Sequence, residues 1–222
     1  MRRALSLALC LVACGSEDPP GAPDASGATD GAPPEQRWLP LATGNRWTYL
    51  VTPLGLPPEQ KSQTIMQVEE VPEKSGQRAF FVVTEKVDGM THSWQEDRGN
   101  MIVRHREVSF DSPGAMNGLE LYDPFKLRVD ETDEHTTMGV DWVNTYTESI
   151  NGGAPFARSE HWYVEAIAED VTVPAGTFPC LRVRRMGTEF GQADKTFWFA
   201  RGVGKVKEAG DQTEELMSYS LP

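Results

Sequence analysis

The sequence predicts an all-β domain over residues 38–222, a curved antiparallel sheet that closes as a half-barrel, a barrel or a sandwich. Short runs of alternating apolar and polar residues recur between turns rich in glycine, proline and asparagine. No segment after residue 13 has the 3.6-residue apolar period of an amphipathic helix. Without a helix to cover it, the apolar face of the sheet has to be buried against the sheet itself.

The first strands follow a turn at Gly44-Asn45. Trp47, Tyr49 and Val51 alternate with polar residues and share one face of a strand. Asp88-Gly89 has the composition of a hairpin turn. Further β-like runs lie at 62–71, 78–87, 91–97 and 101–108.

The next section, residues 109–135, has a weaker pattern. Ser112-Pro113-Gly114 is interpreted as a turn and residues 115–128 as a short helix or a loop. The acidic run at 130–134 is interpreted as a solvated turn.

The clearest strand covers residues 138–150. Its even positions are mostly apolar and its odd positions mostly polar, and only Val143 and Asn144 depart from this alternation. Such a strand has one buried and one solvated face. The apolar even positions are Met138, Val140, Trp142, Tyr146 and Ile150.

The C-terminal third continues in the same way, with a turn at Pro174-Ala175-Gly176 and another at 201–204. The turn spacing gives about ten or eleven strands in total. A repeat of fixed period is missing, which disfavours a propeller or a solenoid. The C-terminal β-like runs lie near 161–166, 181–184, 196–200, 205–208 and 217–221.

The N-terminus has the pattern of a secretory signal. Arg2 and Arg3 precede a short apolar run at 4–13. This run is too short to cross a bilayer. An ordinary cleaved secretory peptide is one interpretation of it.

Leu11-Val12-Ala13-Cys14 resembles a bacterial lipobox. The resemblance implies cleavage between Ala13 and Cys14 and diacylation of the Cys14 thiol, which gives a stable anchor. Gly15 after the cysteine implies sorting to the outer membrane where the source has one. The expected organisation is a signal peptide at 1–13, the lipidated cysteine with a tether at 14–37, and one domain at 38–222.

Composition and charge define the tether and exclude some partners. Residues 15–37 contain no large apolar side chain, so we expect a disordered spacer that spans roughly 25–30 Å. The formal net charge is −12, which repels nucleic acid and anionic lipid headgroups. Membrane attachment therefore has to come from the acyl chains on Cys14, and the expected partners are a hydrophobic ligand or an envelope protein.

Three turn-rich stretches carry a family likeness: 44–49, 171–183 (VTVPAGTFPCLRV) and 197–207 (FWFARGVGKVK). Together they resemble a broad set of uncharacterised bacterial secreted and lipoprotein β-domains. The expected architecture is remotely similar to half-barrel carriers of the LolA/LolB type, which hold lipoprotein acyl chains in a concave sheet. The shared motifs are structural turns, so the resemblance assigns no ligand residue.

The sequence lacks the common motifs of catalytic, metal and cofactor sites. The sequence has no Gly-x-Ser-x-Gly, His-Glu-x-x-His, Walker or Gly-x-Gly-x-x-Gly pattern, so no catalytic residue, metal or cofactor is predicted. His92, His105, His135 and His161 lie on different runs. His105 is interpreted as a buried histidine on the inner face of its strand, with a ligand or general base as the alternative. The many acidic residues leave a pair of catalytic carboxylates open.

Cys180 and the tryptophans each allow two interpretations. Strand parity places Cys180 with Arg182 and Arg184, which would favour a reactive thiolate, whereas the alternative is a small buried side chain beside Phe178. The tryptophans are interpreted as core, with a ligand cavity as the alternative. They are Trp38, Trp47, Trp94, Trp142, Trp162 and Trp198.

The sequence favours a lipid-anchored, non-enzymatic domain that binds a ligand or a partner or has a structural role in the envelope. A tethered envelope hydrolase that uses carboxylate or histidine chemistry is the alternative. A third possibility is an interaction module that docks through an exposed sheet edge or an acidic face.

Overall fold

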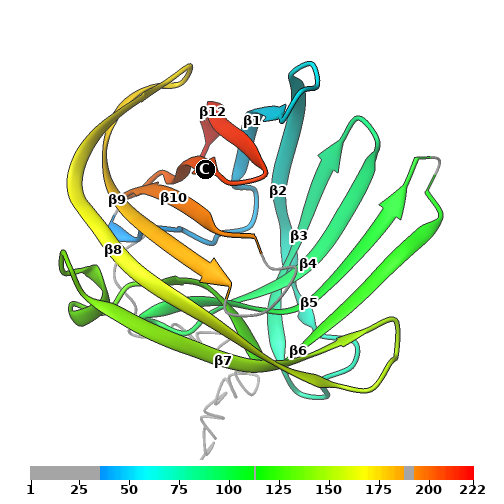
Figure 1. Ribbon diagram of the computed structural model, residues 1–222. Helices are drawn as coiled ribbons and strands as arrows, with labels where there is room; N and C mark the ends of the chain where they lie inside the picture. Colours follow the sequence, from blue (N-terminus) through cyan, green and yellow to red (C-terminus); the bar gives the residue numbers. More distant parts are fainter. Residues whose placement is uncertain (1–35, 113, 188–192) are drawn as a thin grey trace, which may run out of the picture.

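The computed structural model describes residues 36–112, 114–187 and 193–222. In these residues twelve antiparallel strands, β1 to β12, form a closed barrel (Figure 1). Strands that follow one another in sequence lie side by side, and β12 pairs with β1 to close the ring. The strands are β1 (Arg46–Pro53), β2 (Glu59–Glu70), β3 (Arg78–Lys86), β4 (Gly89–Asp97), β5 (Met101–Asp111), β6 (Met116–Asp130), β7 (Asp141–Ile150), β8 (Phe156–Val173), β9 (Gly176–Gly187), β10 (Lys195–Ala200), β11 (Gly204–Ala209) and β12 (Gln212–Ser220).

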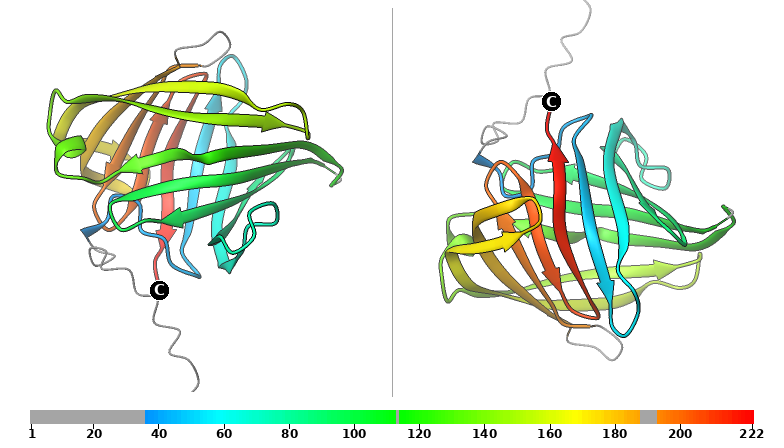
Figure 2. Two further views of the ribbon diagram at one scale, coloured as in Figure 1. Left: turned by 90° about the horizontal axis from the view of Figure 1, so that it is seen from below. Right: turned by 90° about the horizontal axis from the view of Figure 1, so that it is seen from above.

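Closure of the ring removes the free edges that an open sheet would have at β1 and β12. In β1, Trp47 is paired with Gln63 of β2 on one side and with Tyr219 of β12 on the other. The two views of Figure 2 show the strands lengthwise, side by side around the barrel wall. The all-β prediction is confirmed, and the closed barrel is the form that the chain adopts. Every strand has a neighbour on both sides, but β6 and β7 pair with each other over only four residues each, so docking through a sheet edge stays a prediction.

Two details of the expected secondary structure are wrong. The barrel has twelve strands rather than about ten or eleven. Residues 116–130 form strand β6 rather than a short helix or loop. Its register with β5 shifts at three places, and each shift breaks the two-residue alternation that would have marked a strand. Within the acidic run at 130–134, Asp130 is buried rather than solvated.

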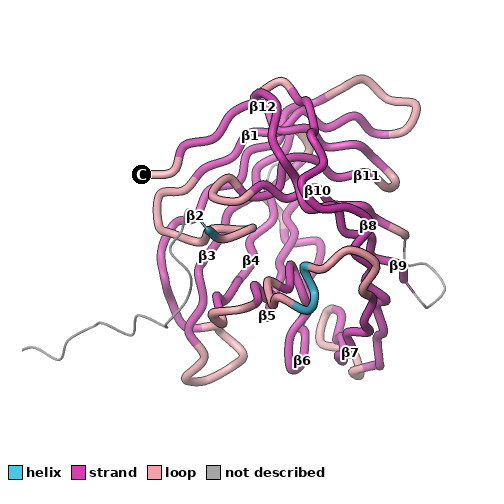
Figure 3. Tube along the Cα trace, turned by 90° about the vertical axis from the view of Figure 1, so that its left-hand side faces the viewer, coloured by secondary structure: helices cyan, strands magenta, loops and turns pink. Residues whose placement is uncertain are grey.

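Helix is almost absent from the part of the chain that the structure describes. Short 3-10 turns such as η2 (Glu134–Thr136) are its helical elements (Figure 3). None of the helices found there has the length and apolar character needed to cross a membrane.

The segment before β1 caps one end of the barrel. The Arg37 side chain is buried and forms ion pairs with Glu131 (2.6 Å) and Asp97 (2.9 Å), which lie at the β6–β7 and β4–β5 connections. The backbone N–H of Gly202, after β10, donates to the Arg37 carbonyl oxygen at 2.8 Å. The cap therefore ties together connections from separate parts of the ring. The folded domain includes Arg37, one residue before the predicted boundary.

The apolar core lies at the capped end. Trp47 of β1 is 2% exposed, and its indole N–H donates to the Val203 carbonyl oxygen at 2.6 Å. Gly204 has a φ of +108°, and a Cβ there would lie 3.0 Å from the Trp47 indole nitrogen, so this close approach requires glycine. Further buried core residues include Tyr49, Val51, Ile65, Val82, Ile102, Trp162, Leu181, Phe197, Phe199 and Leu216.

We expect Trp47→Ala to lower the free energy of unfolding by about 3–5 kcal/mol, because it removes a fully packed indole and leaves a cavity beside Gly204. Urea denaturation followed by circular dichroism measures this loss. Val143→Ala is the control, since Val143 on β7 is 58% exposed and its truncation should change stability by less than about 0.5 kcal/mol. Similar losses in both variants would contradict the assigned core.

Candidate functional site

A chain of alternating charges crosses the interior wall of the barrel. The Lys205 ammonium donates to the Glu208 carboxylate at 2.5 Å and to the Glu214 carboxylate at 2.6 Å. Lys195 extends the chain to β10 through Glu208 (2.6 Å), and Lys61 extends it to β2 through Glu214. Four strands therefore contribute to one network of three lysines and two glutamates, whose side chains are largely buried.

A bulge in β11 brings Lys205 and Glu208 to the same face. Lys205 pairs with Phe199 and Glu208 pairs with Phe197, and the register shifts between them. Glu208 is directly opposite Glu214 of β12. Two carboxylates in this position repel each other. The Lys205 ammonium between them turns the repulsion into two charge-assisted hydrogen bonds.

The network holds both carboxylates ionised. Burial raises the pKa of Glu214, but the charges of Lys205 and Lys61, together with the hydrogen bond from Lys205, outweigh it and lower the pKa to about 2. For Glu208 the same opposition, with Lys205 and Lys195 as the cations, holds the pKa well below its ordinary value. Burial lowers the pKa of Lys205, but the two carboxylates more than offset this and raise it above its ordinary value. A general acid needs a carboxyl group that is protonated near neutral pH, and neither glutamate meets that need.

Lys61 is the lysine of the network whose pKa is lowered. Burial and then repulsion from Lys205 lower its pKa to about 7, although Glu214 acts in the opposite direction. The network has one more ammonium than carboxylates, and Lys61 relieves this excess by losing its proton near neutral pH.

A second polar group lies on β7, β8 and β9. The Tyr146 hydroxyl donates to Glu160 at 3.2 Å, and the Arg185 guanidinium lies 3.3 Å from the same carboxylate oxygen. Arg158 donates to Glu148 at 2.5 Å. Burial raises the pKa of Tyr146, and the charges of Glu160 and Glu148 raise it further, so the phenol stays protonated.

Cations also gather on β5 and β6. Arg104 and Lys126 are directly opposite each other in the ladder. The Lys126 ammonium lies 5.0 Å from the ring centre of Tyr122 and 5.8 Å from that of Tyr146. Burial lowers the pKa of Lys126 to about 8 and that of Arg104 to about 10. Glu107 pairs with Arg104, whereas Lys126 lies beside two aromatic faces and is acted on by the charges of Glu160 and Glu148.

Four of the six tryptophans are buried, as the sequence predicted, whereas Trp142 and Trp198 are partly buried and pack against the core. Trp142, Trp162 and Phe197 stack in sequence across β7, β8 and β10, with ring centres 6.1 and 5.9 Å apart. His135 extends the row, 4.1 Å from Trp142. The row fills space between strands rather than forming an aromatic-lined cleft.

The structure keeps the four histidines apart. His105 is buried, but its ring contacts Glu96 (2.9 Å) and Lys74 of the β2–β3 connection (3.2 Å) rather than residues of the charge network. The interpretation of His105 as a buried histidine with satisfied ring nitrogens is therefore confirmed, and it is the residue that the shifted β5–β6 register skips. His135 and His161 each bond a carboxylate, and His92 lies between two phenylalanine rings, one edge-to-face and the other tilted. Within residues 36–112, 114–187 and 193–222, no group of three possible ligands could hold a metal ion.

Cys180 is completely buried and its thiol donates weakly to the Phe178 carbonyl oxygen at 3.4 Å. Burial, with Glu169 and Asp170 nearby, raises the pKa of Cys180 to about 12. This is the opposite direction from the one that the reactive-thiol hypothesis requires. Arg182, which was expected to favour a thiolate, is paired with glutamates instead. Ala13 and Cys14 lie outside the described residues.

A surface depression of about 340 Å³ lies beside the cap. Trp38, Ile167 and Phe178 give it an apolar wall, and Ile167 is 45% exposed. The register of β8 with β9 shifts between Ala166 and Glu169, so a bulge turns Ile167 outward at this point. Arg201 closes one side of the depression, with its guanidinium 4.3 Å from the Trp38 ring centre.

The charge network was not predicted from the sequence. Lys205, Glu208 and Glu214 looked like ordinary surface residues, because the bulge in β11 changes which positions face inward. One signal was available: Glu214 lies two residues before the apolar Leu216, so it shares a strand face with a core residue.

Comparison with known proteins gives two structural likenesses. A protein from Bacteroides fragilis, described as exported and as having a YmcC-like fold, is 14% identical with a TM-score of 0.46. A protein from Parabacteroides distasonis, described as a lipoprotein, is 10% identical with a TM-score of 0.41. Each match covers 82% of this chain and 98% of the other. No protein-family model and no curated protein matches the sequence.

We expect Lys205→Met to lower the free energy of unfolding at pH 7 by about 3 kcal/mol, because it leaves Glu208 and Glu214 facing each other. In the wild type the lowered carboxyl pKa values stabilise the fold above about pH 4.5, and this contribution is lost as pH falls towards 2. In the variant the repulsion raises a carboxyl pKa, so protonation relieves it. The stability difference should therefore shrink between pH 7 and pH 4, which urea titrations at both pH values measure.

Lys61→Met is the matched control, because Glu214 keeps Lys205 and a costly buried ammonium is removed. Its stability at pH 7 should stay within about 1 kcal/mol of the wild type. Equal losses in the two variants, or a Lys205→Met difference that grows towards low pH, would contradict the central role of Lys205.

Proposed function

We propose that the mature protein is a lipoprotein, anchored through acyl chains on Cys14, whose barrel binds a hydrophobic ligand or an envelope protein and does not catalyse a reaction. It belongs to the cell envelope, at the outer membrane where the source has one. The lipobox-like Leu11–Cys14 and the basic start before it support the anchor.

The path of the chain fits a tethered domain. The tether leads to Arg37, which is fixed in the cap by two ion pairs. A flexible spacer of this length spans roughly 25–30 Å, so the barrel stays within a short distance of the membrane surface. The pull of the tether is applied to the cap, where Arg37 is bound to connections from opposite parts of the ring.

The fixed pairing of the interior carboxylates carries the argument for binding over catalysis. Glu208 and Glu214 converge, as the hydrolase alternative needs, but Lys205 holds both ionised. A glycosidase pair requires one carboxyl group with a raised pKa. The other candidate catalytic residues also support binding over catalysis. The ring of His105 is held by Glu96 and Lys74, and the thiol of Cys180 has a raised pKa.

The depression beside Trp38 is the best-supported binding surface. It combines an exposed isoleucine, an aromatic wall and a cationic rim at Arg201. An apolar surface that a bulge turns towards solvent is typical of a ligand or partner site. Its place beside the cap puts it at the end of the barrel where the tether enters.

We expect Cys14→Ser to abolish incorporation of labelled palmitate and to move the protein from the membrane to the soluble fraction, because the serine hydroxyl cannot form the thioether. Cys180→Ser is the matched control and should keep both the label and the membrane association, since this cysteine is buried in the barrel. Palmitate in the Cys14→Ser protein, or a mature N-terminus at another residue, would reject the anchor.

We expect Ile167→Glu to weaken binding of the apolar fluorescent probe 1-anilinonaphthalene-8-sulfonate by about tenfold, because it places a carboxylate on the apolar wall. Val143→Glu makes the same charge change at another exposed position and should leave probe binding unchanged. Fluorescence titration measures both. Equal probe binding in the two variants would show that the depression is not the apolar binding surface.

A further inference from the structure

The wall of the barrel is incompletely hydrogen-bonded between β6 and β7. The two strands pair at four positions, and the last pair is Asp123 with Thr147. Beyond this pair both strands continue without pairing with each other, over residues 124–130 of β6 and 141–146 of β7. The left view of Figure 2 shows the two strands separating along this stretch. We call these two unpaired stretches the seam.

Residues on the β6 side explain why the ladder stops. Pro124 follows the last paired residue directly and has no N–H to donate to a neighbouring strand. The ammonium of Lys74, in the β2–β3 connection, donates to the carbonyl oxygens of Tyr122 (2.5 Å) and Pro124 (2.6 Å). Both features keep this part of β6 from extending the ladder with β7.

The β7 side of the seam is a regular strand edge. The Val140 carbonyl oxygen accepts from the β8 backbone at 2.9 Å, whereas the Asn151 N–H donates to the β6 backbone at 2.8 Å. Backbone groups alternate between the two sides of a strand, so the N–H and C=O of Asp141, Val143 and Thr145 point towards β6. Among the described residues, no β6 residue is paired with these three.

This edge lacks the usual protection against pairing with another chain. Residues 141–145 contain no proline, glycine or lysine, and β7 pairs with β8 without a register shift. Asp141, Val143 and Thr145 are all exposed, and the Val143 side chain is 58% exposed. The edge is therefore open to another strand.

Two buried donors lie on the inner side of the same strand. The indole nitrogen of Trp142 and the amide nitrogen of Asn144 are buried and have no hydrogen-bond partner among the described residues. A buried donor without an acceptor is unfavourable. The seam therefore needs acceptors along the edge of β7 and on its inner face.

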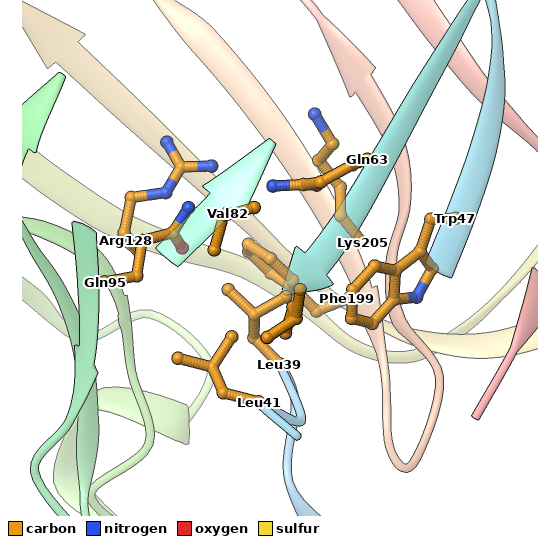
Figure 4. Close-up of a pocket in the computed structure, with 10 residues that line it drawn as sticks. Leu39, Leu41, Trp47, Gln63, Val82, Gln95, Arg128, Phe199 and Lys205 are labelled. Carbon is orange, nitrogen blue, oxygen red and sulfur yellow. The ribbon is translucent and has the colours of Figure 1, made fainter. Parts of the chain in front are cut away.

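A polypeptide strand meets this need, and an acyl chain does not. An extended backbone supplies N–H and C=O groups at the spacing of the β7 edge, and its inward side chains can accept from Asn144. An acyl chain would cover the edge without forming a hydrogen bond. The interior cavity next to β6, which Leu39, Leu41 and Arg128 help to line, measures only about 10 Å³ (Figure 4). An occupant of the seam therefore stays within the wall.

The charges around the seam favour a basic strand. Asp123 at the closed end and Asp141 at the open end have side chains that are 83% and 58% exposed. The whole chain carries a formal net charge of −12. Basic residues towards the ends of an incoming strand would match these carboxylates.

We propose that the seam binds an extended strand from an envelope protein, which pairs with the edge of β7. The strand alternates β-branched residues beside Val143 with small polar residues beside Asn144, and it carries basic residues towards its ends. The inference rests on the proposed function in taking an envelope protein as the partner, but it uses a different surface from the depression beside Trp38.

The test uses the purified full chain and a fluorescent synthetic peptide in which threonine and valine alternate between terminal lysines. Fluorescence anisotropy should show saturable binding. Amide hydrogen exchange followed by nuclear magnetic resonance should be fast at Val143 and Thr145 in the free protein and slow in the complex. Absence of saturable binding, or slow exchange at these amides in the free protein, would overturn the proposal.

A second peptide tests whether the backbone is recognised. N-methyl groups on alternate residues keep its charges and side chains but remove the N–H groups along one edge. It should bind at least about tenfold more weakly than the first peptide. Equal affinity for the two peptides would indicate an apolar surface that takes acyl chains instead, and would overturn the proposal.

Substitutions assign the binding to β7. Val143→Pro removes an N–H that faces the seam and leaves the hydrogen bonds to β8 in place, so it should weaken peptide binding at least about tenfold. Val143→Thr is the matched control, because it keeps the N–H and a β-branched side chain, and it should bind like the wild type. Binding of wild-type strength in Val143→Pro would reject the site. If this variant does not fold, the comparison of the two peptides on the wild type decides the matter.

Ile167→Glu separates this inference from the binding role of the depression. Ile167 lines the depression beside Trp38 and lies outside the seam, so this variant should bind the peptide like the wild type. Loss of peptide binding in Ile167→Glu would contradict the seam as the site. Failure of the depression to bind an apolar probe would leave the peptide result unchanged.

Discussion

Closure of a twelve-stranded ring is the constraint on which the rest of this structure depends. A barrel of about eight strands has an interior that ordinary side chains just fill, and the diameter grows with the number of strands. Twelve strands therefore enclose a space that valine and leucine cannot fill from the wall. The interior instead receives long side chains from many strands, such as Lys61, Arg128 and Lys205, together with large aromatic rings such as Trp162.

Filling the interior with long polar side chains creates an electrostatic problem that the apolar end does not have. Glu208 and Glu214 face each other, and so do Arg104 and Lys126. The structure solves the first case by placing Lys205 between the carboxylates. In the second case Glu107 pairs with Arg104, and Lys126 has a pKa lowered to about 8 and an aromatic face nearby. The barrel has an overall acidic sequence but encloses a group of cations, which makes its interior a different environment from its surface.

The sequence predicted the fold class because apolar and polar residues alternate along every regular stretch of strand. Trp47, Tyr49 and Val51 alternate without interruption, and all three are buried. The prediction failed where register shifts break the alternation, as in β6, and where a bulge brings Lys205 and Glu208 to the same face. The candidate site could not be predicted for the same reason. Its members come from β2, β10, β11 and β12, and only the closure of the ring places β2 near β12.

The cap, which is the segment before β1, connects the expected tether to the interior of the barrel. Leu39 and Leu41 belong to the segment through which the tether enters, and they also form one side of the interior cavity at Arg128. Arg37, two residues earlier, is held by ion pairs to Glu131 and Asp97. A force on the tether therefore acts first on the two ion pairs of Arg37 and only then on the hydrogen bonds between the strands. Because the cap is fixed on several sides of the ring, displacing it requires breaking contacts with separate connections together, which protects the interior from the motion of the anchor.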